Sequence, residues 1–261
     1  MGSHLERAAK PVKARPMDVV HYIEVRGNHL AYRKRAGRGP AILFLPGYMS
    51  DMEGSKASAL DAWAVSEGRA FVRFDYAGCG SSAGTFEEQT LAGWRDDMLA
   101  MIDQIVEGPV LLVGSSMGGW LMLHGALARP DRVVGLVGIA AAPDFTAWGF
   151  TEDQKLTILR EGRVFEQSPY GEQPYVTTRA FWESGESLRL MHAELAIDCP
   201  VRLLHGETDA DVPWTWSLEV LRRLRSADVQ MTLVKQGDHR LSRESDLALL
   251  IATVRSLTES T

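Results

Sequence analysis

The sequence predicts one α/β domain, in which a mostly parallel, eight-stranded sheet is covered by helices on both faces and carries a small helical insertion. Short apolar runs alternate with longer stretches of helical periodicity, a pattern typical of right-handed strand-helix-strand crossovers. This alternation is interrupted only between residues 143 and 198. The length of 261 residues suits one large domain and is too short for two well-packed domains joined by a linker.

The first two predicted strands form an antiparallel hairpin at one edge of the sheet. Residues 19–26 and 29–35 carry the apolar pattern, and Gly27-Asn28 between them is typical of a tight turn. The next six runs consist almost entirely of apolar residues, which indicates strands buried on both faces. These runs cover residues 41–45, 70–74, 109–113, 133–142, 201–204 and 229–234.

The helices expected on the two faces lie at residues 54–67, 87–106, 117–128, 215–225 and 242–257. The insertion covers residues 143–198, so the core is expected to comprise residues 19–142 and 199–261. Within the insertion, residues 151–160 and 178–192 have helical spacing, and Thr151 is the expected N-cap. Residues 1–18 are expected to be a flexible segment that begins with what looks like a tag remnant.

Composition and charge exclude several classes of protein. No window approaches the ~18 consecutive apolar residues of a membrane span, and 24% of the chain is charged. The net charge of -6 and the pI near 5.7 argue against nucleic acid or an anionic membrane as a partner. Cys79 and Cys199 form neither a disulfide framework nor a zinc motif, and no secretory signal is apparent. We therefore expect a soluble, cytoplasmic protein without a metal; the oligomeric state is not predicted.

Residues 109–124 contain the most informative motif. The pattern G-x-S-x-G falls at Gly114, Ser116 and Gly118, with an apolar strand directly before it and a helical stretch directly after it. This setting is the nucleophile elbow of the α/β-hydrolase fold. Such a turn projects the serine hydroxyl clear of the sheet, and the helix N-terminus offers N–H groups to a developing negative charge. The motif predicts Ser116 as a catalytic nucleophile; an ordinary Gly-Ser turn is the alternative.

A carboxylate and a histidine follow the last two strands. Asp209 comes after the strand at 201–204 and His239 after the strand at 229–234, at the edge where catalytic groups of open α/β sheets gather. The order Ser, Asp, His is that of the α/β-hydrolase fold. His239 is therefore the predicted general base, and Asp209 is predicted to orient it.

Other titratable residues lie near these positions. Asp211 and Asp144 are alternative acids, because each also follows a strand of the sheet, whereas Asp238 is expected to face solvent. His124 lies eight residues after Ser116 on the same helix and is expected to pack against the body. His205, at a strand end, is expected to support Asp209.

Tyr48 and Met117 are the predicted N–H donors of an oxyanion hole. Tyr48 lies in the loop after the strand at 41–45, and Met117 directly follows the nucleophile, the two places that supply these donors in this fold. A Pro-Gly turn without a catalytic role is the alternative for the first loop. Aromatic residues suggest an acyl pocket in the insertion, although packing against the body would explain them equally well. The predicted substrate-binding residues are Trp148, Phe150, Phe181 and Trp182.

These motifs resemble those of the α/β-hydrolase-domain protein ten family. The resemblance extends from about residue 30 to the C-terminus and is loose in the insertion; it is carried by residues 44–49, 73–84, 113–124, 202–206 and 238–240. Animal members are described as mitochondrial palmitoyl-protein thioesterases and acyl-glucuronide esterases. The resemblance implies the triad Ser116, Asp209 and His239, no cofactor, a mitochondrial location as the alternative to the cytoplasm, and a bacterial relative of the animal proteins.

Together these observations predict a serine hydrolase that cleaves a carboxylic ester or thioester through an acyl-serine intermediate. The substrate is expected to be a small molecule or another acylated partner. Dehalogenases and epoxide hydrolases of this architecture use an aspartate at the elbow, which Ser116 excludes. The alternative function is a ligand-binding receptor of the same fold that turns over very slowly or not at all.

Overall fold

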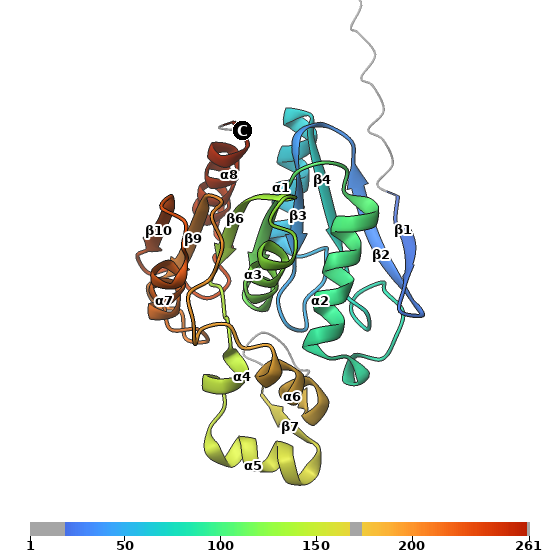
Figure 1. Ribbon diagram of the computed structural model, residues 1–261, viewed down its shortest axis with the longest axis vertical. Helices are drawn as coiled ribbons and strands as arrows, with labels where there is room; N and C mark the ends of the chain where they lie inside the picture. The colour runs from blue at the N-terminus through green and yellow to red at the C-terminus, as the bar shows by residue number, and fades with distance from the viewer. Residues whose placement is uncertain (1–18, 168–173, 260–261) are drawn as a thin grey trace, which may run out of the picture.

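Residues 19–167 and 174–259 are described by a computed structural model, and the expected N-terminal segment at residues 1–18 lies outside them. Within these ranges, eight strands form one sheet in the order β1-β2-β4-β3-β5-β6-β9-β10 (Figure 1). The pairs β1-β2 and β2-β4 are antiparallel, and all other neighbours in this sheet are parallel. The predicted sheet is confirmed; its strands are His21–Val25, Asn28–Arg35, Arg38–Leu45, Arg69–Phe74, Val110–Ser115, Val133–Ile139, Val201–Gly206 and Val229–Val234.

The N-terminal hairpin turns one residue earlier than the sequence suggested. Strand β1 ends at Val25 and β2 begins at Asn28, so Arg26 and Gly27 form the turn in place of Gly27 and Asn28. Both turn residues have positive φ angles, 51° and 79°, which matches the backbone twist of a two-residue hairpin. Asn28 instead pairs with Val25 in the strand ladder.

The two faces of the sheet are covered by different helices (Figure 1). Helices α1 (Ser55–Glu67) and α8 (Glu244–Glu259) contribute to one apolar core. Helices α2 (Leu91–Ala100), α3 (Met117–Ala128) and α7 (Thr215–Arg223) contribute to the other. The central parallel strands are therefore buried on both sides, as their apolar runs predicted.

Three elements differ from their sequence predictions in extent or burial. Strand β10 is half-exposed because it is an edge strand with β9 as its single neighbour. Strand β6 ends at Ile139, because Ala140 takes a φ angle of 46° and the chain turns there. The helix expected over residues 87–106 is divided into a 3-10 turn (η1, Phe86–Glu88), α2 capped by Thr90, and one π-helical turn (η2, Met101–Ile105).

The segment between β6 and β9 contains a small hairpin as well as helices. Helices α4 (Phe145–Trp148), α5 (Glu152–Glu161) and α6 (Arg179–Ser187) accompany strands β7 (Arg163–Glu166) and β8 (Tyr175–Thr178), which pair antiparallel. The expectation of helices alone was therefore wrong, because two four-residue strands leave too short a pattern to recognise. Thr151 caps α5 in a capping box with Gln154, as predicted. The segment lies beyond the carboxyl ends of the sheet strands (Figure 1).

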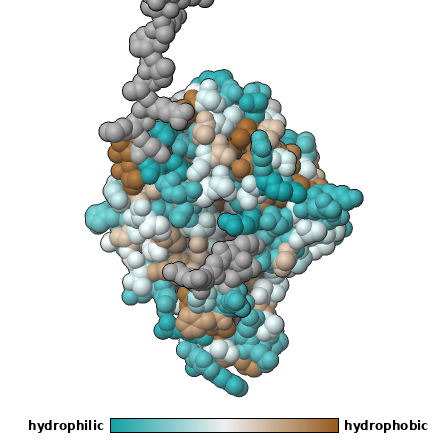
Figure 2. All heavy atoms as spheres, turned by 180° about the vertical axis from the view of Figure 1, so that it is seen from behind, coloured by the Kyte–Doolittle hydropathy of each residue, from teal (hydrophilic) through white to brown (hydrophobic). Residues whose placement is uncertain are grey.

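The described surface is mixed in character. On the face shown in Figure 2, hydrophilic and hydrophobic residues are interspersed, and the hydrophobic areas are small and separate. Among the described helices, none combines the length and the apolar character needed to cross a lipid bilayer.

Candidate active site

Ser116 occupies a strained turn between β5 and α3. Its φ and ψ angles are 54° and -117°, a conformation that non-glycine residues adopt at a cost of about 1–3 kcal/mol. Three backbone hydrogen bonds hold the turn: the N–H of Ser116 donates to Ile139, and its carbonyl accepts from Gly119 and Ala142. The strand end and the helix start thus fix Ser116 where its side chain can reach the loops at the carboxyl edge of the sheet.

The glycines around Ser116 are required by close backbone approach. A Cβ atom at Gly118 would lie 2.1 Å from the carbonyl oxygen of Leu45, and one at Gly114 would lie 2.3 Å from the carbonyl oxygen of Gly118. Both distances are far below contact distance, so neither position accepts a side chain without moving the backbone. The G-x-S-x-G spacing is therefore explained by packing of the turn itself.

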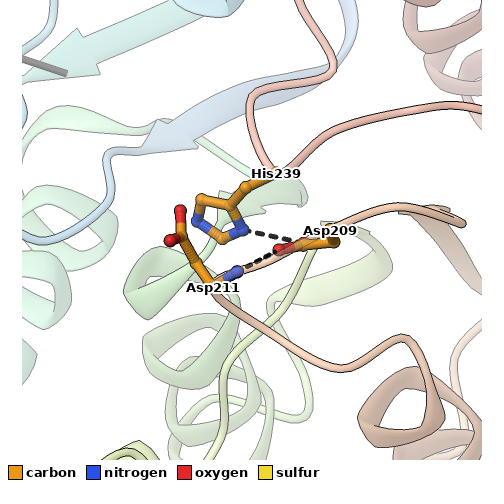
Figure 3. A group of neighbouring side chains, drawn as sticks. All are labelled: Asp209, Asp211 and His239. Carbon is orange, nitrogen blue, oxygen red and sulfur yellow. Dashed lines mark hydrogen bonds and ion pairs between the residues drawn. The ribbon is translucent and has the colours of Figure 1, made fainter. Parts of the chain in front are cut away.

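A hydrogen-bonded relay connects three of the predicted residues. The Oγ atom of Ser116 lies 3.2 Å from Nε2 of His239, and Nδ1 of His239 lies 2.8 Å from Oδ2 of Asp209. Figure 3 shows the imidazole ring of His239 facing Asp209, with the two residues coming from the loops after β10 and β9. With a proton on Nδ1, the ring donates to Asp209 and leaves Nε2 to accept the Ser116 proton.

The carboxylate of Asp209 is buried and surrounded by hydrogen-bond donors. Its Oδ1 atom accepts from the backbone N–H groups of Asp211 (2.9 Å) and Val212 (2.8 Å). Its Oδ2 atom faces two histidines, His239 at 2.8 Å and His205 at 3.1 Å. Burial alone would raise the pKa of Asp209, but the hydrogen bonds from His205, His239 and Val212 and the charge of His239 hold that pKa well below its usual range. Asp209 is thus an ionised acceptor at neutral pH.

The carboxylates considered as alternatives to Asp209 lie outside the hydrogen-bonded relay. Asp211 is exposed and lies beside His239 without bonding to Nδ1, as Figure 3 shows. Asp144 is buried and accepts hydrogen bonds from the backbone N–H groups of Leu190 (2.8 Å) and Met191 (2.9 Å), so it ties together the two ends of the inserted segment. Asp238 is exposed, as expected, and accepts from the backbone N–H of Leu241.

The same part of the site contains a trio of metal-ligand residue types. Ligand atoms of Asp209, Asp211 and His239 lie within 4.8 Å of one another. Both oxygens of Asp209 and the Nδ1 atom of His239 are already engaged in hydrogen bonds. This arrangement fits a proton relay better than a set of metal ligands.

Two backbone N–H groups near Ser116 have no acceptor within the described part of the chain. Neither Tyr48 nor Met117 donates its backbone N–H to any of the described residues. The loop that carries Tyr48 approaches the nucleophile closely, because a Cβ atom at Gly47 would lie 3.4 Å from Cβ of Ser116. Met117 begins α3, where the first N–H groups of the helix lack intrahelical acceptors. The two groups predicted for the oxyanion hole are therefore available to a ligand.

A cavity of about 540 Å³ opens beside the relay, between the inserted segment and the body. Ser116 and His239 line it together with the loop at residues 46–51 and the N-terminal part of α1. The inserted segment contributes aromatic side chains to its wall. These are Phe145, Trp148, Phe150 and Tyr175.

Two residues predicted to bind substrate do not line this cavity. Phe181 is 2% exposed and packs against Tyr48 and Trp94 in the core. Trp182 packs within the inserted segment and donates its indole N–H to the carbonyl of Thr146. Helical spacing located α6 without showing which of its faces meets the cavity.

Phe145 was missed because it lies at the start of α4, a four-residue helix that the sequence pattern did not resolve. Lys56 is a further addition to the wall: burial lowers its pKa to about 8, and its ammonium group donates to the carbonyl of Arg240, beside His239. An isolated lysine in a helix carries no sequence signal for such a position.

Comparison with known proteins places the chain among hydrolases. The alpha/beta hydrolase family matches residues 42–253. Mouse palmitoyl-protein thioesterase ABHD10, mitochondrial, is 45% identical over 234 residues, which is 88% of this chain and 78% of that protein. The structure of mouse alpha/beta hydrolase domain-containing protein 10 is 42% identical, with a TM-score of 0.87 over 93% of this chain and 99% of that one. A putative hydrolase from Agrobacterium vitis S4 is 36% identical, with a TM-score of 0.87 over 94% of this chain and 100% of that one.

Proposed function

The chain belongs to the alpha/beta hydrolase family, and we propose that it is a serine hydrolase that cleaves acyl thioesters and carboxylic esters through an acyl-Ser116 intermediate. One observation carries the proposal: Ser116, His239 and Asp209 form a continuous hydrogen-bonded relay beside a partly aromatic cavity. The backbone strain at Ser116 supports the same proposal, as do the N–H groups of Tyr48 and Met117, which donate to no acceptor in residues 19–167 and 174–259.

In the first half of the reaction, Oγ of Ser116 attacks the acyl carbonyl while its proton passes to Nε2 of His239. Asp209 stabilises the imidazolium that forms. The carbonyl oxygen becomes negatively charged, and the N–H groups of Tyr48 and Met117 stabilise it. When the carbon–sulfur or carbon–oxygen bond breaks, His239 returns the proton to the leaving thiol or alcohol, and the acyl group stays on Ser116.

In the second half, water replaces the leaving group. His239 takes a proton from water as the hydroxide adds to the acyl carbonyl, and the same two N–H groups stabilise the second oxyanion. Collapse of this intermediate releases the carboxylic acid, and His239 returns its proton to Ser116. The cycle consumes one water and needs only groups that the chain supplies.

We favour a thioester with a medium or long acyl chain as the substrate. The relatives' name, palmitoyl-protein thioesterase, supports a long-chain thioester. A cavity of about 540 Å³ with aromatic residues on one wall falls within the size range of small-ligand pockets. Thiols have a pKa of about 8.5 and leave more readily than alcohols, so a thioester requires less help from the imidazolium. The names of the curated relatives also support a mitochondrial rather than the expected cytoplasmic location.

Labelling with a fluorophosphonate, followed by turnover of matched oxygen esters and thioesters, tests the proposal. An activated Ser116 should be labelled covalently, whereas the inert serine of a ligand-binding receptor should not. The Ser116→Ala variant, which should keep the fold, is the control for labelling at another residue. Absence of labelling in the folded wild-type protein would favour the receptor.

A further inference from the structure

A second histidine lies behind the proposed catalytic acid. His205 belongs to β9, and its side chain is completely buried. Its Nε2 atom lies 3.1 Å from Oδ2 of Asp209, the same oxygen that accepts the hydrogen bond from His239, and 2.9 Å from the carbonyl oxygen of Val212. Its Nδ1 atom lies 2.7 Å from the hydroxyl of Ser217 on α7, which is also buried.

These partners determine the tautomer of His205. The Nε2 atom faces an ionised carboxylate and a backbone carbonyl, and both groups can only accept hydrogen bonds. The proton of a neutral ring is therefore on Nε2, where it is shared between the two acceptors. Nδ1 then accepts from the Ser217 hydroxyl, which is free to rotate into the donor position. In this tautomer, each ring nitrogen has a matching partner.

The contact matters because it acts on the oxygen that His239 uses. Oδ1 of Asp209 is held by two backbone N–H groups, from Asp211 and Val212. Oδ2 remains for the two histidines. A donor on the far side of Oδ2 restrains rotation of the carboxylate and takes up part of its negative charge.

We propose that His205 is a positioning residue for the hydrolytic reaction: its Nε2–H holds the Asp209 carboxylate in register with His239 and limits how strongly that carboxylate stabilises protonated His239. The inference rests on the proposed function, because it assigns His205 a role through Asp209 and His239. His205 touches neither substrate nor Ser116 in this role.

Replacing His205 by leucine should therefore change both rate and pH dependence. When Asp209 no longer shares its charge with His205, it should stabilise the imidazolium more strongly, so the acid limb of the kcat/KM pH profile should move to higher pH by about 0.5 unit. Because the carboxylate is less well held, the plateau kcat should fall about tenfold with little change in KM. His205→Gln should restore much of both, because its side-chain amide N–H lies near the position of the Nε2–H.

The other charged groups near His239 stay the same in this comparison. They are the Asp211 carboxylate beside the ring, the neighbouring Asp238 and Arg240, and Lys56, which donates to the carbonyl of Arg240. A matched control is His124→Gln, because His124 is also buried but bonds to the carbonyl of Leu188. This variant should leave the acid limb in place. A purely structural His205 would alter the stability of the leucine variant but would also leave the limb in place.

Two nuclear magnetic resonance measurements decide the question without turnover. In the wild-type protein at neutral pH, the ¹⁵N shifts of His205 should show a protonated Nε2 and an unprotonated Nδ1, and this readout does not depend on any variant folding. In the Ser116→Ala background, the pKa of His239 can be titrated with and without His205→Leu. The opposite tautomer, or an unmoved His239 titration in the folded leucine variant, would overturn the inference. Failure of the proposed function would appear separately, as wild-type turnover that does not depend on Ser116.

Discussion

The phenol hydroxyl of Tyr48 donates a 2.5 Å hydrogen bond to the carbonyl oxygen of Val176. This bond joins the loop after β3, which carries one proposed oxyanion donor, to strand β8 of the inserted segment. The Tyr48 ring also packs against aromatic side chains from the body and the insertion, among them Trp94, Phe145 and Phe181. Burial raises the pKa of Tyr48, so the hydroxyl remains a donor. The wall of the cavity and the oxyanion loop are thus held by the same side chain.

Tyr48→Phe should lower kcat about three- to tenfold, because the loop loses its hydrogen bond to β8 while the backbone N–H remains. The free energy of unfolding should fall by about 1 kcal/mol, the usual contribution of one such bond. Steady-state kinetics and urea unfolding measure both effects. Tyr22→Phe, at an exposed position on β1, is the control. An unchanged kcat in a destabilised variant would mean that the bond serves folding only.

Ser116→Ala should reduce turnover of a p-nitrophenyl ester by roughly 10⁴ to 10⁶, the range expected when a member of a catalytic triad is removed. The protein should stay folded. The backbone strain at position 116, where φ is 54°, should not change, because alanine carries a Cβ atom just as serine does. Circular dichroism checks the fold. Retention of more than a tenth of the activity would contradict the assignment of the nucleophile.

Asp209→Asn should cost about 10⁴ in kcat, because the amide can present a donor to Nδ1 and favour the wrong tautomer of His239. Asp211→Asn should cost far less, since Asp211 does not bond to Nδ1. Comparison of the two variants under identical conditions shows which carboxylate orients His239. If the larger loss followed Asp211→Asn, the relay seen here would not be the one that operates.

Burial of His124 predicts a specific acid sensitivity. Burial lowers its pKa to about 4, against 6.5 in the unfolded chain, so the unfolded state binds the extra proton as the pH falls below 6.5. Native stability should therefore decrease between pH 6.5 and 4, and His124 should account for about 2 kcal/mol of the loss between pH 7 and 5. His124→Gln keeps a donor for Leu188 but cannot titrate, so its unfolding free energy should fall less over this range. Equal slopes in urea unfolding would show that other groups cause the loss.

The sequence predicted the parts of the molecule whose patterns are local. Long apolar runs marked the central strands, and the glycine spacing marked the turn at Ser116. The errors concern which side of a short element faces the cavity: Phe181, predicted to bind substrate, faces the core, whereas Phe145, which was not predicted, lines the wall. The sequence predicted that His205 supports Asp209, but it did not predict the tautomer of His205. That tautomer depends on Val212 and Ser217, which tertiary folding places beside the His205 ring.

The aromatic wall of the cavity predicts a preference for medium or long acyl groups over acetate. Each buried CH₂ contributes about 0.8 kcal/mol, so four additional carbons should favour kcat/KM by ~3 kcal/mol, a factor of ~100. A series from C2 to C12 with one leaving group measures this directly. The preference should weaken in Phe150→Ala and Trp148→Ala, which remove side chains from the wall. Trp182→Ala is the matched control, because this residue belongs to the same segment but packs within it. A flat profile, or equal losses in all three variants, would mean that the inserted segment packs over Ser116 without selecting the acyl chain.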